Sequence, residues 1–238
     1  MVAGSPTPAE VLAAMLAADP GRPRVTYYDD TPGPTQGERI ELSAKVLANW
    51  VSKAANALQD EWDLGPGDTV RIALPPHWRS LYWALATWSV GATVALDPEH
   101  ADLVVTDDPV TAEQEPPAVL VTLAALARGA QTAAAPEVFD EARQLATFPD
   151  QFVAYADPSP DDAALQLAGG TTAYADVVPE TDWPQGVRVH TSGDELVEVL
   201  RAALAAWSRD GSIVLSRGPE PEGGRASRLA AEGVTLEL

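Results

Sequence analysis

Three histidines are the side chains of this sequence best suited to metal binding or proton transfer. They are His77, His100 and His190, and they lie far apart without the paired ligand spacing of a zinc site. A zinc site is therefore not expected. His77 and His190 each follow an expected strand, and ligand sites of open α/β sheets lie at the carboxyl ends of strands. A functional pair is one interpretation, and a position in a helix-entry loop is the simpler one.

Other familiar catalytic patterns do not occur. The chain contains no Gly-x-Ser-x-Gly elbow, no Gly-x-Gly-x-x-Gly fingerprint and no Walker loop, and it has no cysteine. Serine hydrolase chemistry of that type, thiol chemistry and disulfides are thus not expected. Trp83 and Trp88 are expected to pack in the core, whereas Trp78 stands near a strand end, where ligand contacts occur. Asp161-Asp162 and 113–115 are interpreted as solvated charge.

Composition limits the classes of partner. The 238 residues include 35 acidic and 15 basic side chains, which give a formal net charge of −20. Such a surface repels nucleic acid and anionic membranes, so neither is an expected partner. The sequence has no basic-then-apolar leader at its N-terminus and no apolar run of membrane-spanning length, so we expect a soluble cytoplasmic protein.

The elements that must position any site are organised around residues 68–97. A short β-branched run after Gly65-Pro66-Gly67 predicts a buried strand, and the spacing of Leu81, Leu85 and Trp88 predicts a helix that ends at Gly91. A second apolar strand follows, up to Asp97. Strand, helix and strand form a βαβ unit, which closes onto a parallel sheet.

Flanking patterns predict further elements. Thr7 and Ser43 are expected to cap helices, the second of which runs to about Leu64. Shorter helices are expected at 123–128, from 136 to about 146, at one turn of 174–178, and at 194–208 and 225–232. Strands are expected at 24–28, 38–42, 103–106, 119–121, 163–167, 187–190, 212–215 and 234–236, with a polar turn at 169–172.

The βαβ pattern occurs twice. The string Ala-Leu-Ala-x-Trp-Ser recurs at 84–89 and 203–208, each time between two apolar strands. We interpret this as a duplication. The expected fold is α/β and three-layered, with mainly parallel sheets flanked by helices and two similar βαβ halves. One domain, 1–238, would contain halves at about 1–130 and 158–238 joined by 131–157.

Residues 40–108 resemble the N-terminal part of adenylate-forming enzymes, the AMP-binding superfamily of acyl-CoA synthetases, luciferases and peptide-synthetase adenylation domains. The resemblance lies in Glu41-Leu42-Ser43 before a long helix, in Leu64-Gly65-Pro66-Gly67-Asp68 before a strand, and in 83–96 and 101–107. It implies a large N-terminal domain with two similar α/β subdomains, which fits the duplication.

The resemblance also implies where ATP phosphates would bind. The family's loop, Ser/Thr-Gly-Ser/Thr-Thr-Gly-x-Pro-Lys-Gly, corresponds best to 168–177, so Gly169, Gly170, Thr171 and Thr172 are the candidate cofactor-binding residues. The lysine position of that loop is occupied by Asp176, and an anion there opposes phosphate binding. A rival alignment on Thr191-Ser192-Gly193 is followed by two acidic residues and no lysine.

Lysine is scarce in the sequence as a whole. The two lysines are Lys45 and Lys53, the family's catalytic lysine comes from a C-terminal domain, and the chain ends before such a domain. We therefore expect a truncated, degenerate relative that is not competent for adenylation, uses no cofactor, and binds an unknown protein partner or a small molecule. One alternative is a sensor that retains weak binding of an adenine nucleotide or acyl group. Another is a subunit that completes a partner enzyme and exposes a large apolar patch.

Overall fold

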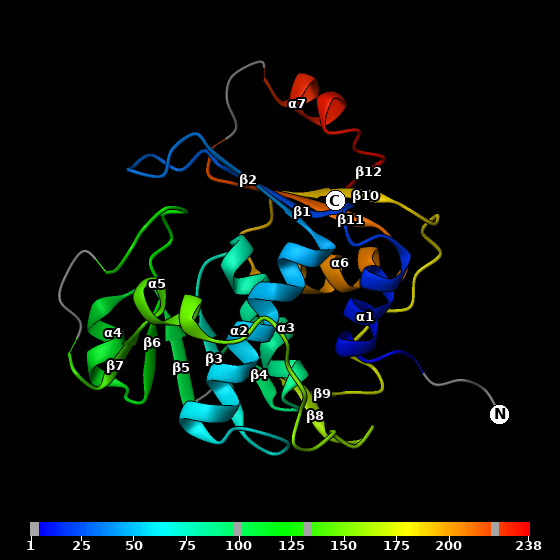
Figure 1. Ribbon diagram of the computed structural model, residues 1–238. Coiled ribbons are helices and arrows are strands. Elements are labelled where there is room, and N and C mark those ends of the chain that lie inside the picture. Colours follow the sequence, from blue (N-terminus) through cyan, green and yellow to red (C-terminus); the bar gives the residue numbers. More distant parts are fainter. Residues whose placement is uncertain (1–4, 98–100, 131–134, 220–223) are drawn as a thin grey trace. The chain divides into compact units, whose positions relative to one another are not determined.

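The computed structural model describes residues 5–97, 101–130, 135–219 and 224–238 (Figure 1). The chain divides into two compact units. The first consists of Met1–Ala48, Pro75–Trp78 and Val178–Leu238, and the second of Asn49–Leu74 and Arg79–Val177. Each unit is built on its own mainly parallel β-sheet, as the sequence predicts.

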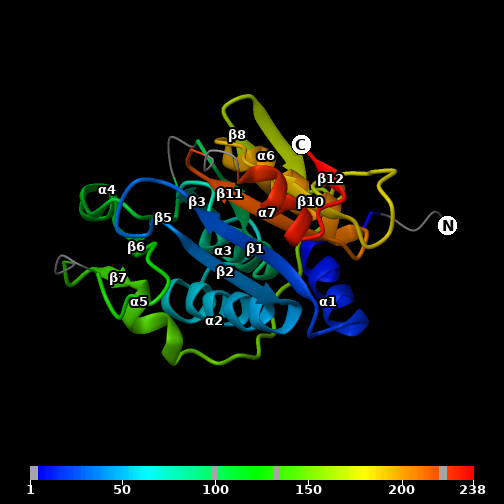
Figure 2. The same cartoon turned by 90° about the horizontal axis from the view of Figure 1, so that it is seen from above.

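The described part of the first unit contains a five-stranded sheet, and Figure 2 shows its strands side by side. The strand order is β12-β10-β11-β1-β2, and only the β1–β2 pairing is antiparallel. Helix α6 packs on β10 and β11 and also contacts α1. The elements are α1 (Pro8–Ala18), β1 (Pro23–Asp29), β2 (Glu38–Ser43), β10 (Arg188–Thr191), α6 (Leu196–Ser208), β11 (Ser212–Arg217), α7 (Arg225–Ala231) and β12 (Leu236–Glu237).

The second unit contains a seven-stranded sheet over the described residues. Its order is β7-β6-β5-β3-β4-β8-β9, and only the β8–β9 pairing is antiparallel. Its elements are β3 (Thr69–Ala73), α3 (Trp78–Ser89, whose first residue belongs to the first unit), β4 (Thr93–Ala95), β5 (Leu103–Thr106), α4 (Pro109–Gln114), β6 (Ala118–Leu120), β7 (Val138–Asp140), α5 (Glu141–Gln144), a 3-10 turn η1 (Leu145–Thr147), β8 (Ala163–Leu167) and β9 (Gly170–Ala173). Helix α2 (Ala44–Trp62) begins in one unit and ends in the other.

Local sequence signals explain the helix starts. Thr7 accepts a hydrogen bond from the Glu10 amide, and the Glu10 carboxylate accepts one from the Thr7 amide, which completes a capping box before Pro8. The Ser43 hydroxyl accepts a hydrogen bond of 3.3 Å from the Val46 amide at the start of α2. Both predicted caps are therefore confirmed.

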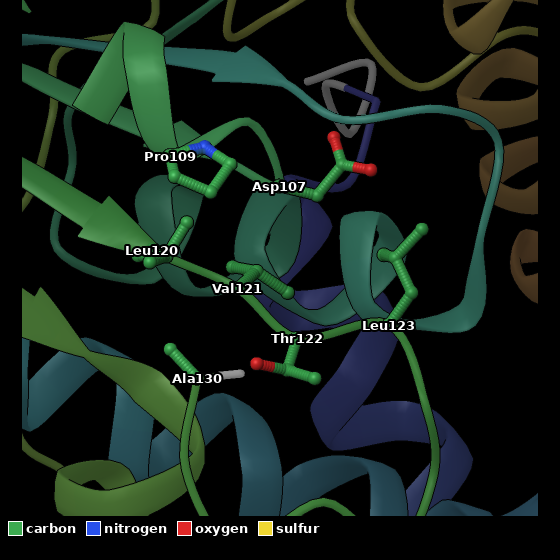
Figure 3. A pocket seen from close by; sticks show the side chains of 7 residues that line it. All are labelled: Asp107, Pro109, Leu120, Val121, Thr122, Leu123 and Ala130. Carbon is green, nitrogen blue, oxygen red and sulfur yellow. The ribbon is translucent and has the colours of Figure 1, made fainter. Parts of the chain in front are cut away.

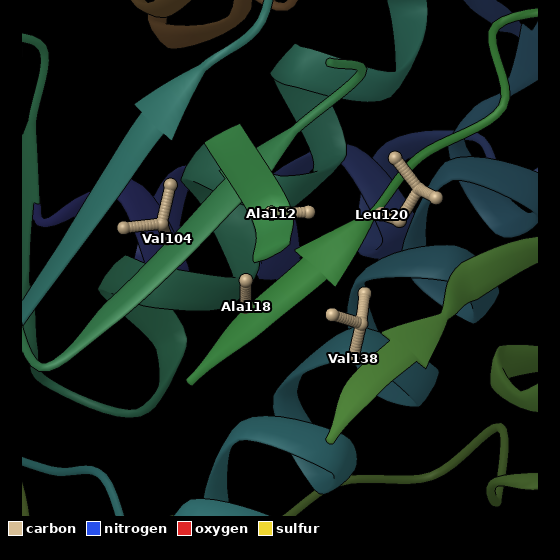
Figure 4. Close-up of a cluster of buried hydrophobic side chains, with 5 residues drawn as sticks. All are labelled: Val104, Ala112, Ala118, Leu120 and Val138. Atoms are coloured by element: carbon tan, nitrogen blue, oxygen red, sulfur yellow. The ribbon is translucent and has the colours of Figure 1, made fainter. Parts of the chain in front are cut away.

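Apolar side chains fill the space between each sheet and its helices. In the second unit, α4 covers β5 and β6, and the buried side chains beneath it form the cluster shown in Figure 4: Val104, Ala112, Ala118, Leu120 and Val138. Trp83 and Trp88 of α3 are fully buried, as predicted. The predicted βαβ units are confirmed as β3-α3-β4 and β10-α6-β11, each with parallel strands.

Four local predictions were wrong. Residues 123–128 form turns instead of a helix, and 174–178 form turns instead of a helical turn. The segment 136–146 splits into strand β7 followed by α5 and η1, because 138–140 pair with β6. The expected polar turn at 169–172 is largely strand β9, which is paired with β8. In each paired case, pairing with a neighbouring strand overrides local propensity.

Each compact unit is assembled from separate stretches of the chain. Residues 135–157 lie inside the second unit, and the first unit draws together strands from both ends of the chain. The single-domain organisation with halves at 1–130 and 158–238 stays a proposal. Among the described residues, no helix is long and apolar enough to cross a membrane.

Candidate functional site

The four candidate phosphate-binding residues lie on the hairpin of β8 and β9. Gly169, Gly170 and Thr171 are exposed and Thr172 is half-buried. Gly170 has a φ of +136°, a conformation that favours glycine, and it pairs with Leu167 across a two-residue turn. Residues 170–173 are therefore extended and laddered onto β8. Such a strand does not aim successive amides at one anion, as a phosphate-binding loop does.

The charge beside this hairpin is negative. Asp176 is exposed, and its amide donates to the Ala173 carbonyl at 3.0 Å in the turn that leaves β9. Two residues earlier, Tyr174 is buried, and its hydroxyl donates to the Ala92 carbonyl at 2.7 Å. The turn is thus anchored with its carboxylate in solvent. The lysine of this unit, Lys53, donates instead to the Phe148 carbonyl and pairs with Asp150.

The two described histidines belong to the first unit and are buried. His77 lies just before α3, as predicted for a helix-entry loop, and its ring meets Tyr27 edge-on at 4.5 Å between centroids. His190 lies inside β10, in agreement with the strand predicted at 187–190 and not in a helix-entry loop, and its Nε2 is 3.2 Å from the Ser216 hydroxyl. His100 lies outside the described residues. In the described part of the chain, no cluster of His, Cys, Asp or Glu could hold a metal ion.

Trp78, the aromatic side chain expected near a ligand, is 3 % exposed. Its ring lies 5.6 Å from the ring of His77. Trp78 is therefore part of a packed aromatic group with His77 and Tyr27 in the first unit.

A cavity that sequence reasoning missed lies at the carboxyl ends of β5 and β6 (Figure 3). Its volume is about 300 Å³, and its walls are Asp107, Pro109, Leu120, Val121, Thr122, Leu123 and Ala130. The available signal was that two adjacent buried strands, 103–106 and 119–121, are followed by polar residues, namely Asp107 and Thr122. The cavity was not predicted because residues 123–128, which border it, were expected to form a helix.

A buried ion pair lies close to this cavity. Arg79 of α3 and Glu141 of α5 are 4 % and 1 % exposed, and their side chains are 2.8 Å apart. The Tyr82 hydroxyl also donates to Glu141. Burial raises the pKa of the Glu141 carboxyl from 4.5 to about 7, although the Arg79 guanidinium acts in the opposite direction.

Comparison with known proteins assigns the family. No protein-family model matches the chain. A TIGR03089 family protein of Mycobacterium tuberculosis is 36 % identical over 251 residues, and the match covers 96 % of each protein. The chain belongs to the TIGR03089 family.

Solved structures show which fold this TIGR03089 family member has. The N-terminal domain of FACL13 from Mycobacterium tuberculosis matches 98 % of the chain with a TM-score of 0.70 at 12 % identity. Acetoacetyl-CoA synthetase from Streptomyces lividans matches 97 % with a TM-score of 0.73 at 17 % identity. The chain spans 62 % of the FACL13 structure and 42 % of the synthetase structure. The fold is that of acyl-CoA synthetase N-terminal domains, so the resemblance seen in residues 40–108 is confirmed at the level of fold.

Proposed function

We propose that this TIGR03089 family chain is a non-catalytic protein with an acyl-CoA synthetase-like fold, which binds a small ligand and does not form adenylates. The observation that carries the proposal is the conformation and charge of residues 168–177. There a paired β-strand and an exposed Asp176 occupy the stretch that the sequence resemblance aligns with the family's phosphate-binding loop and its lysine.

Electrostatics supports this proposal. A unit charge about 4 Å from a phosphate charge interacts by roughly 1 kcal/mol in water, and more where water is excluded. Exchange of a cation for an anion changes the sign of each such interaction, and ATP carries several charges. Screening weakens the effect at the exposed Asp176 but leaves its direction unchanged. Lys53, the lysine of the second unit, is already engaged by the Phe148 carbonyl and Asp150.

The surface favours a small ligand over completion of a partner enzyme. The exposed large apolar side chains of the described residues lie on five separate segments, and only Val153 and Tyr155 share one: Val46, Val110, Leu126, Val153, Tyr155 and Leu238. Apolar residues scattered in this way are ordinary on a protein surface, whereas a subunit interface needs a contiguous patch. The cavity at the ends of β5 and β6, about 300 Å³ in volume, offers a concave surface to a small molecule instead.

ATP–pyrophosphate exchange tests the proposal. The full chain is incubated with Mg-ATP, labelled pyrophosphate and a panel of fatty, aryl and amino acids, beside an active acyl-CoA synthetase as the positive control. We expect no exchange above the protein-free blank with any acid. Exchange that depends on an acid and disappears in the T171V/T172V double variant would overturn the proposal, because it would place nucleotide chemistry at the hairpin.

A further inference from the structure

The five-stranded sheet of the first unit has one apolar face and one polar face. On the apolar face, Val189 of β10 packs with Ala206 of α6. Parallel sheets are usually apolar on both faces, because helices cover both. By strand register, however, the other face of this sheet carries polar side chains, among them Thr26, Tyr28, Arg39, Arg188, Ser212 and Ser216. A polar face is therefore a departure from the ordinary packing of such a sheet.

Helix α7 lies over this polar face and is attached to it mainly by charge (Figure 1). Among the described residues of α7, Leu229 alone is buried. Arg228 donates two hydrogen bonds to Asp30, at 2.5 and 2.9 Å, and its guanidinium lies 4.1 Å from the centre of the Tyr28 ring. A segment with so little apolar burial opens at a lower cost in free energy than the core of the sheet does.

Glu232, the residue that follows α7, is held by cationic and phenolic donors. One oxygen of its carboxylate accepts from the Tyr28 hydroxyl and from Arg39 Nε at 3.0 Å, and the other accepts from Arg188 at 2.6 Å. The Glu232 side chain is 8 % exposed. Burial acts to raise its pKa, but these hydrogen bonds hold the pKa below 4.5, so Glu232 is ionised at neutral pH. Charge-assisted donors to both oxygens are the means by which proteins bind oxyanions.

The sheet positions the two arginines without help from Glu232. Arg188 also donates to the Thr26 hydroxyl at 2.9 Å, and Arg39 also pairs with Glu41 at 2.7 Å. Since these partners belong to β1 and β2, both guanidinium groups stay in place when Glu232 leaves. Two arginines beside one glutamate then carry one excess positive charge. In a chain with a net charge of −20, such a local cation is what an anionic group requires.

We propose that α7 is a latch closed by Glu232, whose carboxylate fills an oxyanion-binding site formed by Tyr28, Arg39 and Arg188. A small carboxylate or a phosphate takes this site when the latch opens. Because the latch competes with the ligand, the apparent affinity falls in proportion to the fraction of chains in which the latch is open. The inference goes beyond the proposed function, since the site belongs to the first unit, whereas the hairpin of β8 and β9 and the cavity belong to the second.

Calorimetric titration of the full chain with acetate and with inorganic phosphate tests the competition, at neutral pH and at an ionic strength fixed with sodium chloride. Glu232→Ala removes the internal carboxylate and keeps its donors, so it should bind the preferred anion about tenfold more tightly than the unsubstituted chain does. The tighter of the two anions identifies the natural group as a carboxylate or a phosphate. Glu237→Gln is the matched control and should leave binding unchanged, because Glu237 pairs with Arg225 outside the site.

A further substitution locates the bound anion. In the Glu232→Ala chain, Arg188→Gln should weaken anion binding about tenfold, because a charge-assisted hydrogen bond is lost. Absence of saturable binding by Glu232→Ala, equal gains in E232A and E237Q, or binding that is indifferent to Arg188→Gln would each overturn the inference.

Hydrogen exchange in the unsubstituted chain keeps the test decisive if a variant is unstable. The amides of 232–234 report on the latch, because they donate to the carbonyls of Arg228, Ala230 and Leu229 at 2.9 to 3.1 Å. An excess of the preferred anion should speed their exchange relative to chloride of equal ionic strength, and the amides of 213–215 in β11 should not change. Equal exchange of 232–234 in both salts would overturn the latch. Pyrophosphate exchange would remove the proposed function and leave this site untouched, whereas failure of the latch would leave the proposed function in place.

Discussion

Trp88 and Trp207 make the same hydrogen bond in the two sheets. The indole N–H of Trp88 donates to the Ala164 carbonyl of β8 at 2.7 Å, and that of Trp207 donates to the Arg24 carbonyl of β1 at 3.1 Å. Strand β8 is the neighbour of β4, and β1 is the neighbour of β11. Each tryptophan therefore links the helix of its βαβ motif to the next strand of the same sheet, which lies outside that motif.

The equivalence extends to the helix ends and the strand order. Gly91 and Asp210, three residues after the tryptophans, both have positive φ, +87° and +53°. The amides of the next residues donate to the carbonyls of Thr87 and Ala206 at 3.0 and 2.8 Å. The orders β5-β3-β4-β8-β9 and β12-β10-β11-β1-β2 correspond, each with a terminal antiparallel strand. These correspondences support duplication as the origin of the repeated string.

The equivalence predicts similar losses of stability at the two tryptophans. Trp88→Phe and Trp207→Phe each keep an aromatic ring but leave a buried carbonyl without its donor, so each should lower the free energy of unfolding by about 1 to 2 kcal/mol. Urea unfolding of the single variants, followed by circular dichroism, measures the effect. A loss in one variant and none in the other would contradict the structural equivalence.

Asp210 is predicted to stabilise the first unit through its charge. Its carboxylate is 2.6 Å from the buried Arg24 and 2.9 Å from Arg22. Asp210→Asn tolerates the same positive φ but removes the charge, so the free energy of unfolding should fall by about 2 kcal/mol. Asp210→Gly, which relieves the backbone, should still lose stability. Arg24 also donates to the backbone carbonyls of Asp210 and Gly211. An unchanged urea midpoint in the Asp210→Asn variant would show that these two carbonyls stabilise the buried Arg24 without the carboxylate.

Glu141 should make stability depend on pH. Its folded pKa, about 7, lies above its ordinary value of 4.5, so the folded chain binds more protons than the unfolded chain between these values. The contribution of Glu141 to the stability of the folded chain is complete below about pH 4.5, and it is lost as pH rises toward and through 7. The free energy of unfolding is expected to fall by on the order of 3 kcal/mol over this pH range.

Urea midpoints measured from pH 5 to 8 for the unsubstituted chain and for Glu141→Gln test this dependence. The glutamine side chain is uncharged, like the protonated Glu141 carboxyl, so the variant should be about as stable as the unsubstituted chain at pH 5 and more stable than it at pH 8. It should also lose part of the decline with rising pH. An identical pH profile in both chains would mean that Glu141 stays ionised throughout, held by Arg79 and Tyr82.

Gly170 distinguishes a paired strand from a pliable phosphate-binding loop. With φ at +136°, Gly170→Ala forces a side chain into an unfavourable backbone conformation, although no other atom lies within 4 Å of the new Cβ. The free energy of unfolding should fall by roughly 1 to 2 kcal/mol. Gly169→Ala, which has no positive φ and equal space, is the matched control and should change little. Equal effects in the two variants would argue against this hairpin geometry.

Sequence reasoning succeeded where the signal is local. The Thr7 cap, the Ser43 cap and the βαβ unit from 68 to 97 are encoded by neighbouring residues, and all are present. It failed at 169–172, which were expected to form a polar turn, because residues 170–173 pair with the adjacent strand β8. It also failed where the decisive partner is distant. The loop that borders the cavity is held by hydrogen bonds from Arg79 to the Ala124 carbonyl and from the Ala130 amide to Asp140. No spacing of residues in the sequence predicts these contacts.

Direct titration of Mg-ATP into the full chain tests the central claim, that the hairpin of β8 and β9 has no capacity to hold nucleotide phosphates. Isothermal calorimetry with millimolar nucleotide should show no saturable heat for the unsubstituted chain or for Asp176→Asn. Saturable binding that tightens in Asp176→Asn and is lost in T171V/T172V would contradict the account, because it would place triphosphate at this hairpin.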